Sequence, residues 1–249
     1  MSGIYTLSER PELGRQISDI HNAVWPRFMQ ENDVANRAWP LLFEVWGDFQ
    51  VVLVGEEDRV VAAGHALPFA WDGSLETLPY GWEAATAQGM RDYEQGIAPG
   101  ALNAYAIVVA PGQQGKGYSG FILNALRVQA QKYGLHSVVA CVRPTLKALY
   151  PLTPIERYAR WTQPDGLPFD PWIRVHWRAG GEMLNVSPRS MEITGSVGEW
   201  EEWAGMCFPE SGEYVVKGAL QPVTIDVESD KGLYYDPNVW MWHKIRAVE

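Results

Sequence analysis

The segments Ala104-Tyr-Ala-Ile-Val-Val109, Ala110-Pro-Gly-Gln-Gln-Gly-Lys-Gly117 and Tyr118-Ser-Gly-Phe-Ile-Leu-Asn-Ala-Leu-Arg-Val-Gln-Ala-Gln-Lys-Tyr-Gly134 follow one another without a break. The first is apolar or β-branched on both faces, which is typical of a strand buried on both sides. An apolar stripe that begins at Phe121 predicts a helix, and Gly134 stands where helices commonly end. The stretch therefore predicts a strand, a glycine turn and a helix, and free amides at the helix start could hold a phosphate.

Two known glycine motifs fail on this turn. A P-loop reads G-x-x-x-x-G-K-[S/T], but here Gly117 follows the lysine where serine or threonine is needed. A nucleophile elbow reads G-x-S-x-G, and Phe121 replaces its last glycine after Ser119. Neither a nucleotide triphosphatase nor a serine hydrolase is therefore predicted from this turn.

The dinucleotide motif G-x-G-x-x-G is matched in full by Gly115, Gly117 and Gly120. That motif also expects an acidic residue about 20 residues further on, at the end of the next strand. The next predicted strand, Ser137–Val142, ends instead at Arg143. A nicotinamide oxidoreductase thus stays an alternative that rests on the glycines alone, and we expect no NAD or NADP binding.

A further pattern fits the turn better. The run Val109-Ala-Pro-Gly-Gln-Gln-Gly-Lys-Gly-Tyr-Ser119 resembles the pyrophosphate loop of the GNAT superfamily of acyl-CoA N-acyltransferases, [Q/R]-x-x-G-x-[G/A] after Val-x-Pro. Gln114, Gly117 and Pro111 are on pattern, and Ser119 departs from it with another small residue. The resemblance implies that loop amides bind the coenzyme A pyrophosphate while the central strand's main chain holds the pantetheine and aligns the thioester. The residues so implied are Ile107, Val108, Val109, Gln114, Gly115, Lys116, Gly117, Tyr118 and Ser119.

Composition bounds the class of protein. The 249 residues are 47% hydrophobic and 20% charged, which suits a globular chain with a substantial core. A net charge of −10 argues against nonspecific nucleic-acid binding. The two cysteines, Cys141 and Cys207, make a disulfide framework unexpected and favour a reducing cytosol. Met1–Tyr5 lacks a basic and apolar leader, and no apolar run is long enough to span a membrane.

Local patterns predict the other elements in chain order. They are a strand at Ile4–Leu7, a helix capped by Ser8 and reaching Trp25-Pro26, a helical Leu41–Trp46, a hairpin of Asp48–Gly55 with Val60–Leu67, one or two strands within Glu182–Thr194, a capping box at Ser196–Glu199, and a mostly extended tail. Strand, two helices, hairpin and central strand is the order of the GNAT fold. We expect an α+β, three-layer architecture: a mixed central sheet flanked by helices, as one domain over 1–249 with a core of about 1–195 and a β-rich extension of about 196–249.

Two segments leave alternatives open. Residues 68–101 form an aromatic insertion, for which a surface helix with a solvated face is favoured over a substrate lid. Three prolines interrupt residues 143–161, which predicts a broken helical excursion. Its polar and aromatic residues could line an acceptor pocket or form a packed surface, and they are Arg157, Tyr158, Arg160 and Trp161.

His176 is singled out by its place. Asp170-Pro171 predicts a helix start and Gly180-Gly181 its end. In many GNAT enzymes a tyrosine four residues before that glycine protonates the departing coenzyme A thiolate, and His176 occupies this position. Imidazolium is an able acid near neutral pH. The resemblance thus implies His176 as the proton donor, with a hydrogen-bonded structural histidine as the alternative.

The same segment, with Arg189 beyond it, also resembles the GNAT-like loading domains of polyketide synthases, which transfer acyl groups to a carrier-protein thiol or decarboxylate malonyl-coenzyme A. A base for an amine acceptor is harder to place, because Asn103 and Tyr105 stand where relatives often have a glutamate. Tyr105 could relay a proton through water, or be a buried aromatic. No histidine has a second histidine or a cysteine at ligand spacing, so no metal is expected.

The predicted function is transfer of an acyl group, most simply acetyl, from coenzyme A to a small-molecule amine, with His176 and Tyr105 as candidate catalytic residues. Transfer to a carrier-protein thiol, decarboxylation of malonyl-coenzyme A, and a non-catalytic acyl-coenzyme A-binding module are the alternatives. We expect no nucleic-acid or membrane partner. The sequence does not indicate an oligomeric state.

Overall fold

A computed structural model describes residues 3–245; Met1, Ser2 and residues 246–249 lie outside the described part, including the start of the N-terminal segment considered above. The strands are β1 Gly3–Thr6, β2 Val51–Val54, β3 Val60–Phe69, β4 Ala101–Val109, β5 Ser137–Val142, β6 Glu182–Gly195, β7 Gly212–Tyr214, β8 Val223–Asp226 and β9 Lys231–Lys244. The α-helices are α1 Gly14–Val24, α2 Asp33–Glu44, α3 Trp82–Glu94, α4 Tyr118–Lys132, α5 Ile155–Tyr158, α6 Pro171–Arg178 and α7 Val197–Ala204.

The strands form one mixed sheet in the order β1-β2-β3-β4-β5-β9-β8-β7, and β6 pairs with β9. The predicted hairpin is confirmed as antiparallel β2 and β3, and β4 pairs with β5 in parallel. Parallel neighbours need a crossover, and the predicted helix α4 supplies it. The predicted α+β class is confirmed.

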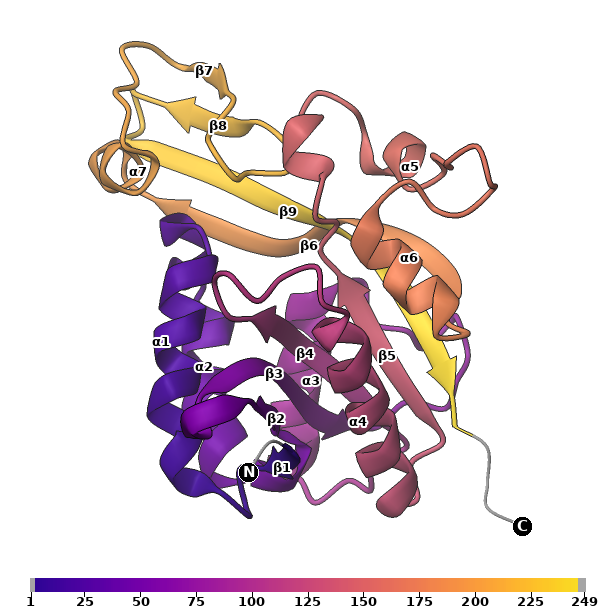
Figure 1. Ribbon diagram of the computed structural model, residues 1–249. Helices are drawn as coiled ribbons and strands as arrows, with labels where there is room; N and C mark the ends of the chain where they lie inside the picture. Colours follow the sequence, from indigo (N-terminus) through magenta and orange to yellow (C-terminus); the bar gives the residue numbers. More distant parts are fainter. Residues whose placement is uncertain (1–2, 246–249) are drawn as a thin grey trace.

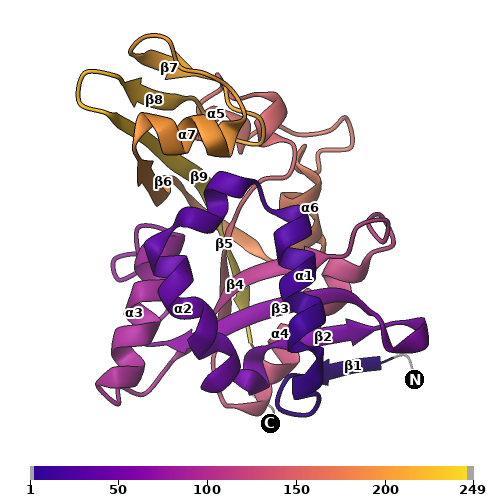
Figure 2. The ribbon, with the colours of Figure 1, turned by 90° about the vertical axis from the view of Figure 1, so that its left-hand side faces the viewer.

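Helices cover both faces of the sheet: α1, α2 and α3 lie on one face and α4 and α6 on the other (Figures 1 and 2). Gly64 of β3 lets α4 approach closely, since a Cβ there would lie 2.3 Å from Cγ2 of Ile122. Gly89 of α3 does the same on the opposite face, where a Cβ would lie 2.1 Å from Cδ1 of Leu67. The sheet is therefore buried on both sides around β3 and β4, as the apolar strand pattern predicts.

One local expectation is wrong. Ser8 does not cap a helix, because α1 begins at Gly14 after a short 3₁₀ turn. Asn32 caps α2 instead, its Oδ1 accepting from the Ala35 amide at 2.8 Å. The surface helix expected within 68–101 is α3, whose Arg91, Tyr93 and Glu94 are exposed. Its other side packs on the sheet: Trp82 is buried, and the buried Asp92 carboxylate accepts from the Ala70 amide at 2.7 Å. The strand before this helix, β3, is buried because α3 packs over it.

The chain after residue 195 completes the sheet. β9 pairs with β5 over Ser137–Val142 and with β6 over most of its length. The predicted capping box is confirmed, with Ser196 accepting from the Glu199 amide at the start of α7. The last long strand thus lies beside β5, in the interior of the sheet (Figure 1).

Candidate active site

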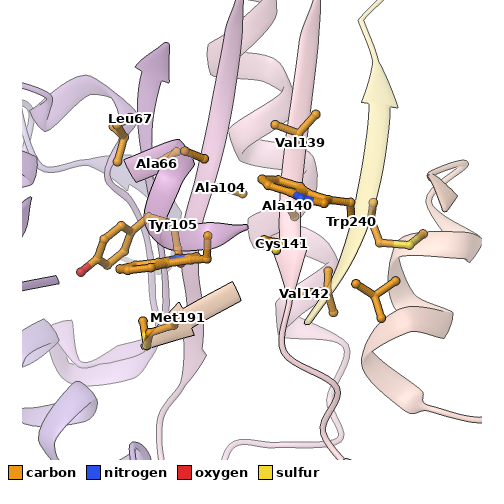
Figure 3. Close-up of a cluster of buried hydrophobic side chains, with 14 of the residues drawn as sticks. Ala66, Leu67, Ala104, Tyr105, Val139, Ala140, Cys141, Val142, Met191 and Trp240 are labelled. Carbon is orange, nitrogen blue, oxygen red and sulfur yellow. The ribbon is translucent and has the colours of Figure 1, made fainter. Parts of the chain in front are cut away.

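The two central strands separate where the site forms. β4 pairs with β5 only from Ala101 to Ala104, so the main-chain groups that β4 turns toward β5 have no strand partner beyond that point. The register between β3 and β4 shifts at the same place, where Tyr105 is an extra residue, a β-bulge. Its carbonyl accepts from Nε1 of Trp82 at 2.7 Å. Figure 3 shows Ala104 next to Cys141, with the ring of Tyr105 directed away from Cys141.

A cavity of about 860 Å³ occupies the divergence. Its size is in the range of small-molecule sites. Its walls come from both helical layers as well as the sheet: His21 and Trp25 belong to α1, Trp39 to α2, and Trp172 and His176 to α6. Because α1 and α6 lie on opposite faces of the sheet, the cavity passes between β4 and β5 and can admit one reactant from each face.

The glycine turn at one end of the cavity has the backbone that a phosphate site needs. Gly112, Gly115 and Gly117 have φ of 77°, 78° and 79°, a region that side chains rarely adopt, and a Cβ on any of them would enter open space. None of the amides from Gln114 to Ser119 donates a hydrogen bond to another residue among 3–245. A row of free amides therefore stands at the N-terminus of the 15-residue helix α4.

Eight of the nine residues implied as the coenzyme A site line the cavity, and Lys116 does not. Its Nζ donates to Oε1 of Gln113 at 2.8 Å on the exposed side of the turn. The side chain of Gln114 braces the turn internally, because its Oε1 accepts from the Gly112 amide at 2.9 Å and its Nε2 donates to the Val109 carbonyl at 3.4 Å. The turn thus offers main-chain groups, with Lys116 turned outward.

The third glycine of the dinucleotide motif lacks its structural role. In that motif the last glycine permits close packing of helix on strand. A Cβ on Gly120 would have no neighbour within 4 Å. Gly120 therefore matches the last glycine of G-x-G-x-x-G in spacing but not in structural role.

His176 is fully buried on α6 and lines the cavity. The helix starts as predicted, with Oδ1 of Asp170 accepting from the amides of Trp172 and Ile173. Nδ1 of His176 lies 2.9 Å from Nε2 of His243, and its Nε2 has no hydrogen-bond partner among residues 3–245. Burial, and then His243, hold the pKa of His176 well below its usual range, so the ring is neutral near pH 7. A resting imidazolium is disfavoured because nothing at the site compensates a buried charge, and the role of His176 as proton donor stays a prediction.

His243 is a residue that sequence reasoning missed. It lies on β9, 67 residues from His176, and an alternating apolar strand gives no signal for such a partner. A Cβ on Gly181 would lie 2.6 Å from Cε1 of His243, so this glycine leaves room for the ring. Burial, and then Arg127, lower the pKa of His243 to about 4. The pair is a neutral, enclosed hydrogen-bonded unit.

Tyr105 lines the cavity but is a buried aromatic. Its ring lies 4.6 Å from that of Trp82, centroid to centroid, and its hydroxyl donates weakly to the Ala35 carbonyl at 3.4 Å. Burial raises the pKa of its hydroxyl well above the usual value. A proton relay through Tyr105 is thus disfavoured by its surroundings.

A second histidine pair lies on the other face. Nε1 of Trp25 donates to Nδ1 of His21 at 3.1 Å, and Nδ1 of His65 lies 2.9 Å from Oε1 of Gln50. The rings of His21 and His65 are 4.9 Å apart, centroid to centroid, and their Nε2 atoms have no partner among residues 3–245. Only His21 reaches the cavity wall.

The excursion after β5 reaches the cavity with its first residues and not with its four candidate residues. Of its four candidate residues, Tyr158 donates from its hydroxyl to Oδ2 of Asp170 at 2.8 Å and packs against Trp161, and none lines the cavity. The excursion contributes Arg143 and Thr145 instead. In the sequence, Arg143 stands only where the dinucleotide motif needs an acid. Its place at the carboxyl end of a parallel strand is a signal for ligand binding, because ligands commonly bind at that edge of a sheet.

Within residues 3–245, no cluster of three or more histidine, cysteine, aspartate or glutamate side chains is arranged to hold a metal ion. No helix in the same range is long and apolar enough to cross a bilayer. Both cysteines are free thiols, Cys141 buried and Cys207 exposed.

No protein-family model matches the chain. The chain is similar to the arginine N-acetyltransferase avaD of Aspergillus versicolor, with 29% identity over 273 aligned positions that cover 97% of this chain and 93% of avaD. Among solved structures, the fold is similar to the loading GNATL domain of CurA from Lyngbya majuscula, with a TM-score of 0.65 and 15% identity over 98% of each chain. It is also similar to the GNAT-like decarboxylase GphF in complex with isobutyryl-CoA, with a TM-score of 0.59 and 17% identity over 98% of this chain and 100% of the other. The chain therefore has a GNAT-like fold and is similar over nearly its whole length to an N-acetyltransferase.

Proposed function

We propose that this protein transfers an acetyl group from acetyl-coenzyme A to a small-molecule amine. The observation that carries the proposal is the cavity between β4 and β5, which has free amides at one end and an unpartnered histidine nitrogen in its wall. The acetyl donor and an amine acceptor follow the name of avaD, and amino acids related to arginine are the first acceptors to test.

The donor occupies the side formed by β4 and the glycine turn. The pyrophosphate accepts from the amides between Gln114 and Ser119 at the positive end of α4. The pantetheine lies along Ile107–Val109, where β4 lacks its β5 partner. The thioester carbonyl is polarised by a main-chain amide of this stretch, a preorganised donor where negative charge develops.

His176 then transfers one proton between the reactants. The acceptor nitrogen attacks the thioester carbonyl carbon and forms the C–N bond, and the nitrogen becomes positively charged. Neutral His176 takes a proton from this nitrogen at Nε2, and returns it to the sulfur as the C–S bond breaks and free coenzyme A leaves. Nδ1–H of His176 donates to His243 throughout, which fixes the tautomer and stabilises the transient imidazolium.

The pKa of His176 suits this cycle. A depressed pKa keeps the resting imidazole neutral and able to accept a proton, and it makes the protonated ring a strong donor to a thiolate. A separate glutamate base is then unnecessary, which accounts for Asn103 and Tyr105 at that place. Transfer to a carrier-protein thiol or decarboxylation of malonyl-coenzyme A would use the same cavity, and both stay second candidates.

The test is incubation of the protein with acetyl-, malonyl- and longer acyl-coenzyme A and with amine and thiol acceptors, read by mass spectrometry and by release of free thiol. An amide product together with one free thiol per product supports the proposal. A thioester product, loss of carbon dioxide from malonyl-coenzyme A, or binding without turnover would each replace it by the corresponding alternative.

We also propose that residues 1–249 act as one domain and that the extension of about 196–249 is part of the catalytic unit, since β9 carries His243.

A reducing compartment such as the cytosol is proposed from the exposed free thiol of Cys207.

A further inference from the structure

Arg143 stands at the carboxyl end of β5, where the cavity passes through the sheet. Its Nε donates to both oxygens of Asp236, at 3.0 and 3.1 Å, and its Nη2 donates to the Gly218 carbonyl at 2.7 Å. The Tyr234 hydroxyl also interacts with the guanidinium, and no further carboxylate or carbonyl among residues 3–245 accepts from it. A guanidinium has five N–H donors, so the contacts with Asp236, Gly218 and Tyr234 hold Arg143 in place on the cavity wall and leave donors for a ligand.

Asp236 cannot bind a ligand in its present arrangement. It is buried, and its two oxygens also accept from the Tyr234 hydroxyl at 2.6 Å and from Nδ2 of Asn238 at 2.7 Å. A carboxylate offers about four lone-pair sites, and the four hydrogen bonds from Arg143, Tyr234 and Asn238 fill them. The acid orients Arg143 and has no capacity left for an incoming ammonium or guanidinium.

The rest of the wall offers no competing charge. Among residues 3–245, Arg143 is the only lysine or arginine and Asp236 the only aspartate or glutamate on the cavity lining. Beside them stand neutral polar side chains, Thr145 and Asn238. The guanidinium of Arg143 is thus oriented by a carboxylate whose acceptor sites are all occupied, and its remaining N–H groups can bind a planar anion.

We propose that Arg143 binds a carboxylate group of the molecule that reacts in this cavity. The carboxylate can belong to the acceptor, as the α-carboxylate of an amino acid, or to the acyl group of the donor, as in a malonyl thioester. The inference rests on the proposed function, because it assigns the substrate class of the same site. It adds that Arg143 is the residue that distinguishes an amino acid from its decarboxylated amine.

The experiment compares matched molecules that differ in the carboxylate. In one arm, L-arginine is compared with agmatine and L-lysine with cadaverine, by acetyl-transfer kcat/KM and by calorimetric binding to the protein saturated with coenzyme A. In the other arm, malonyl-coenzyme A is compared with acetyl-coenzyme A by calorimetry. We expect the carboxylate-bearing member to be favoured in one arm by about 10- to 100-fold, the contribution of one charged hydrogen bond.

The variants assign that preference to Arg143. Arg143→Gln alone leaves Asp236 buried and uncompensated and is expected to melt earlier, so the decisive variant is Arg143→Gln/Asp236→Asn, which removes both charges together. It should lose the carboxylate preference while its affinity for acetyl-coenzyme A stays unchanged. Arg143→Lys should keep part of the preference, and the exposed Arg160→Gln should keep all of it.

The outcomes separate the inference from the proposed function. Absence of amide product while a carboxylate preference persists in binding would remove N-acetyl transfer and leave the inference standing. No carboxylate preference in either arm, or a preference that survives in the folded double variant, would overturn it.

Discussion

The glycine turn and the His176–His243 pair both line the cavity, but they differ in how the chain builds them. The turn lies within a single stretch of chain, is exposed, and offers main-chain amides whose positions follow from three positive-φ glycines. The pair joins α6 to β9 across 67 residues, is buried, and offers one side-chain nitrogen whose state depends on its partner. Binding of a phosphate can thus be encoded locally, whereas proton transfer here depends on the packing of distant segments.

This difference separates the effects of mutation. A change in the turn should alter affinity for coenzyme A, because free amides contact the donor in its ground state. A change in the pair should alter turnover, because in the proposed mechanism Nε2 of His176 exchanges a proton only during the reaction. The predictions below test that separation.

The largest effect is expected from His176→Ala. Removal of the proton shuttle should lower kcat by about 10²- to 10⁴-fold while the Kd for acetyl-coenzyme A stays nearly constant. His176→Tyr should recover part of the rate, because a phenol can also donate a proton to a thiolate. A fully active alanine variant, with chemistry shown to be rate-limiting, would remove His176 from the mechanism. Joint loss of thermal stability, affinity and turnover would indicate a structural histidine.

Gly117→Val should weaken coenzyme A binding by about 10- to 100-fold, since a branched side chain stands where the pyrophosphate must approach the amides. At φ of 79° a valine is also strained, which should lower the free energy of unfolding by about 1–3 kcal/mol. Gly120→Ala is the matched control: it lies within α4, has open space at Cβ, and should raise stability by up to about 1 kcal/mol with unchanged affinity. Calorimetry and thermal melting measure both, and unchanged affinity in a folded Gly117→Val protein would contradict a phosphate site here.

Acid should destabilise the histidine side of the cavity. Burial lowers the pKa of His21 to about 3 and that of His243 to about 4, and it holds those of His65 and His176 well below their usual range. The unfolded chain binds these protons near pH ~6.5, so it holds more protons than the native state below that pH, and stability falls as the pH falls.

This stability is fully present above about pH 6.5 and decreases below it by up to about 1.4 kcal/mol per pH unit for each histidine. Urea unfolding at pH 7, 6 and 5 measures the effect, and the dependence should correspond to uptake of more than one proton on unfolding. Equal unfolding free energies at these three values would show that the histidines are not held neutral.

Gly181→Ala probes the space that the pair needs. A Cβ at this position would lie 2.6 Å from Cε1 of His243 and 2.9 Å from the carbonyl oxygen of His176, so the His243 ring must shift. We expect a loss of about 1–3 kcal/mol in unfolding free energy, a several-fold lower kcat and an unchanged Kd for coenzyme A. Gly198→Ala, with no neighbour within 4 Å, is the control. A variant with wild-type kcat would show that the position of His243 does not matter for turnover.

For NAD and NADP we expect no measurable binding. The turn carries the three glycines, but no acid follows β5 and Gly120 packs against nothing. Calorimetry with either nucleotide measures this, with acetyl-coenzyme A as the positive control. Saturable binding would show that the turn recognises a pyrophosphate without regard to the rest of the donor.

The sequence alone determined what depends on neighbours in the chain. The strand, glycine turn and helix from 104 to 134, the hairpin, the Asp170 cap and the Ser196 capping box follow from periodicity and local hydrogen bonding, and they are present in the structure. Ser8 failed as a cap because serine also serves turns, and a start at Gly14 has no cap signal. For α3, periodicity does not show which strands the buried side of the helix covers.

Only the tertiary structure determined the chemistry of the site. The divergence of β4 from β5, the contact of His176 with His243, and the saturation of Asp236 that leaves Arg143 available all join segments far apart in the chain. The neutral state of His176 also required the fold, because a pKa depends on burial and on neighbouring groups rather than on residue type. A spacing pattern can place a histidine on a helix, but the surrounding packing decides whether its proton is available.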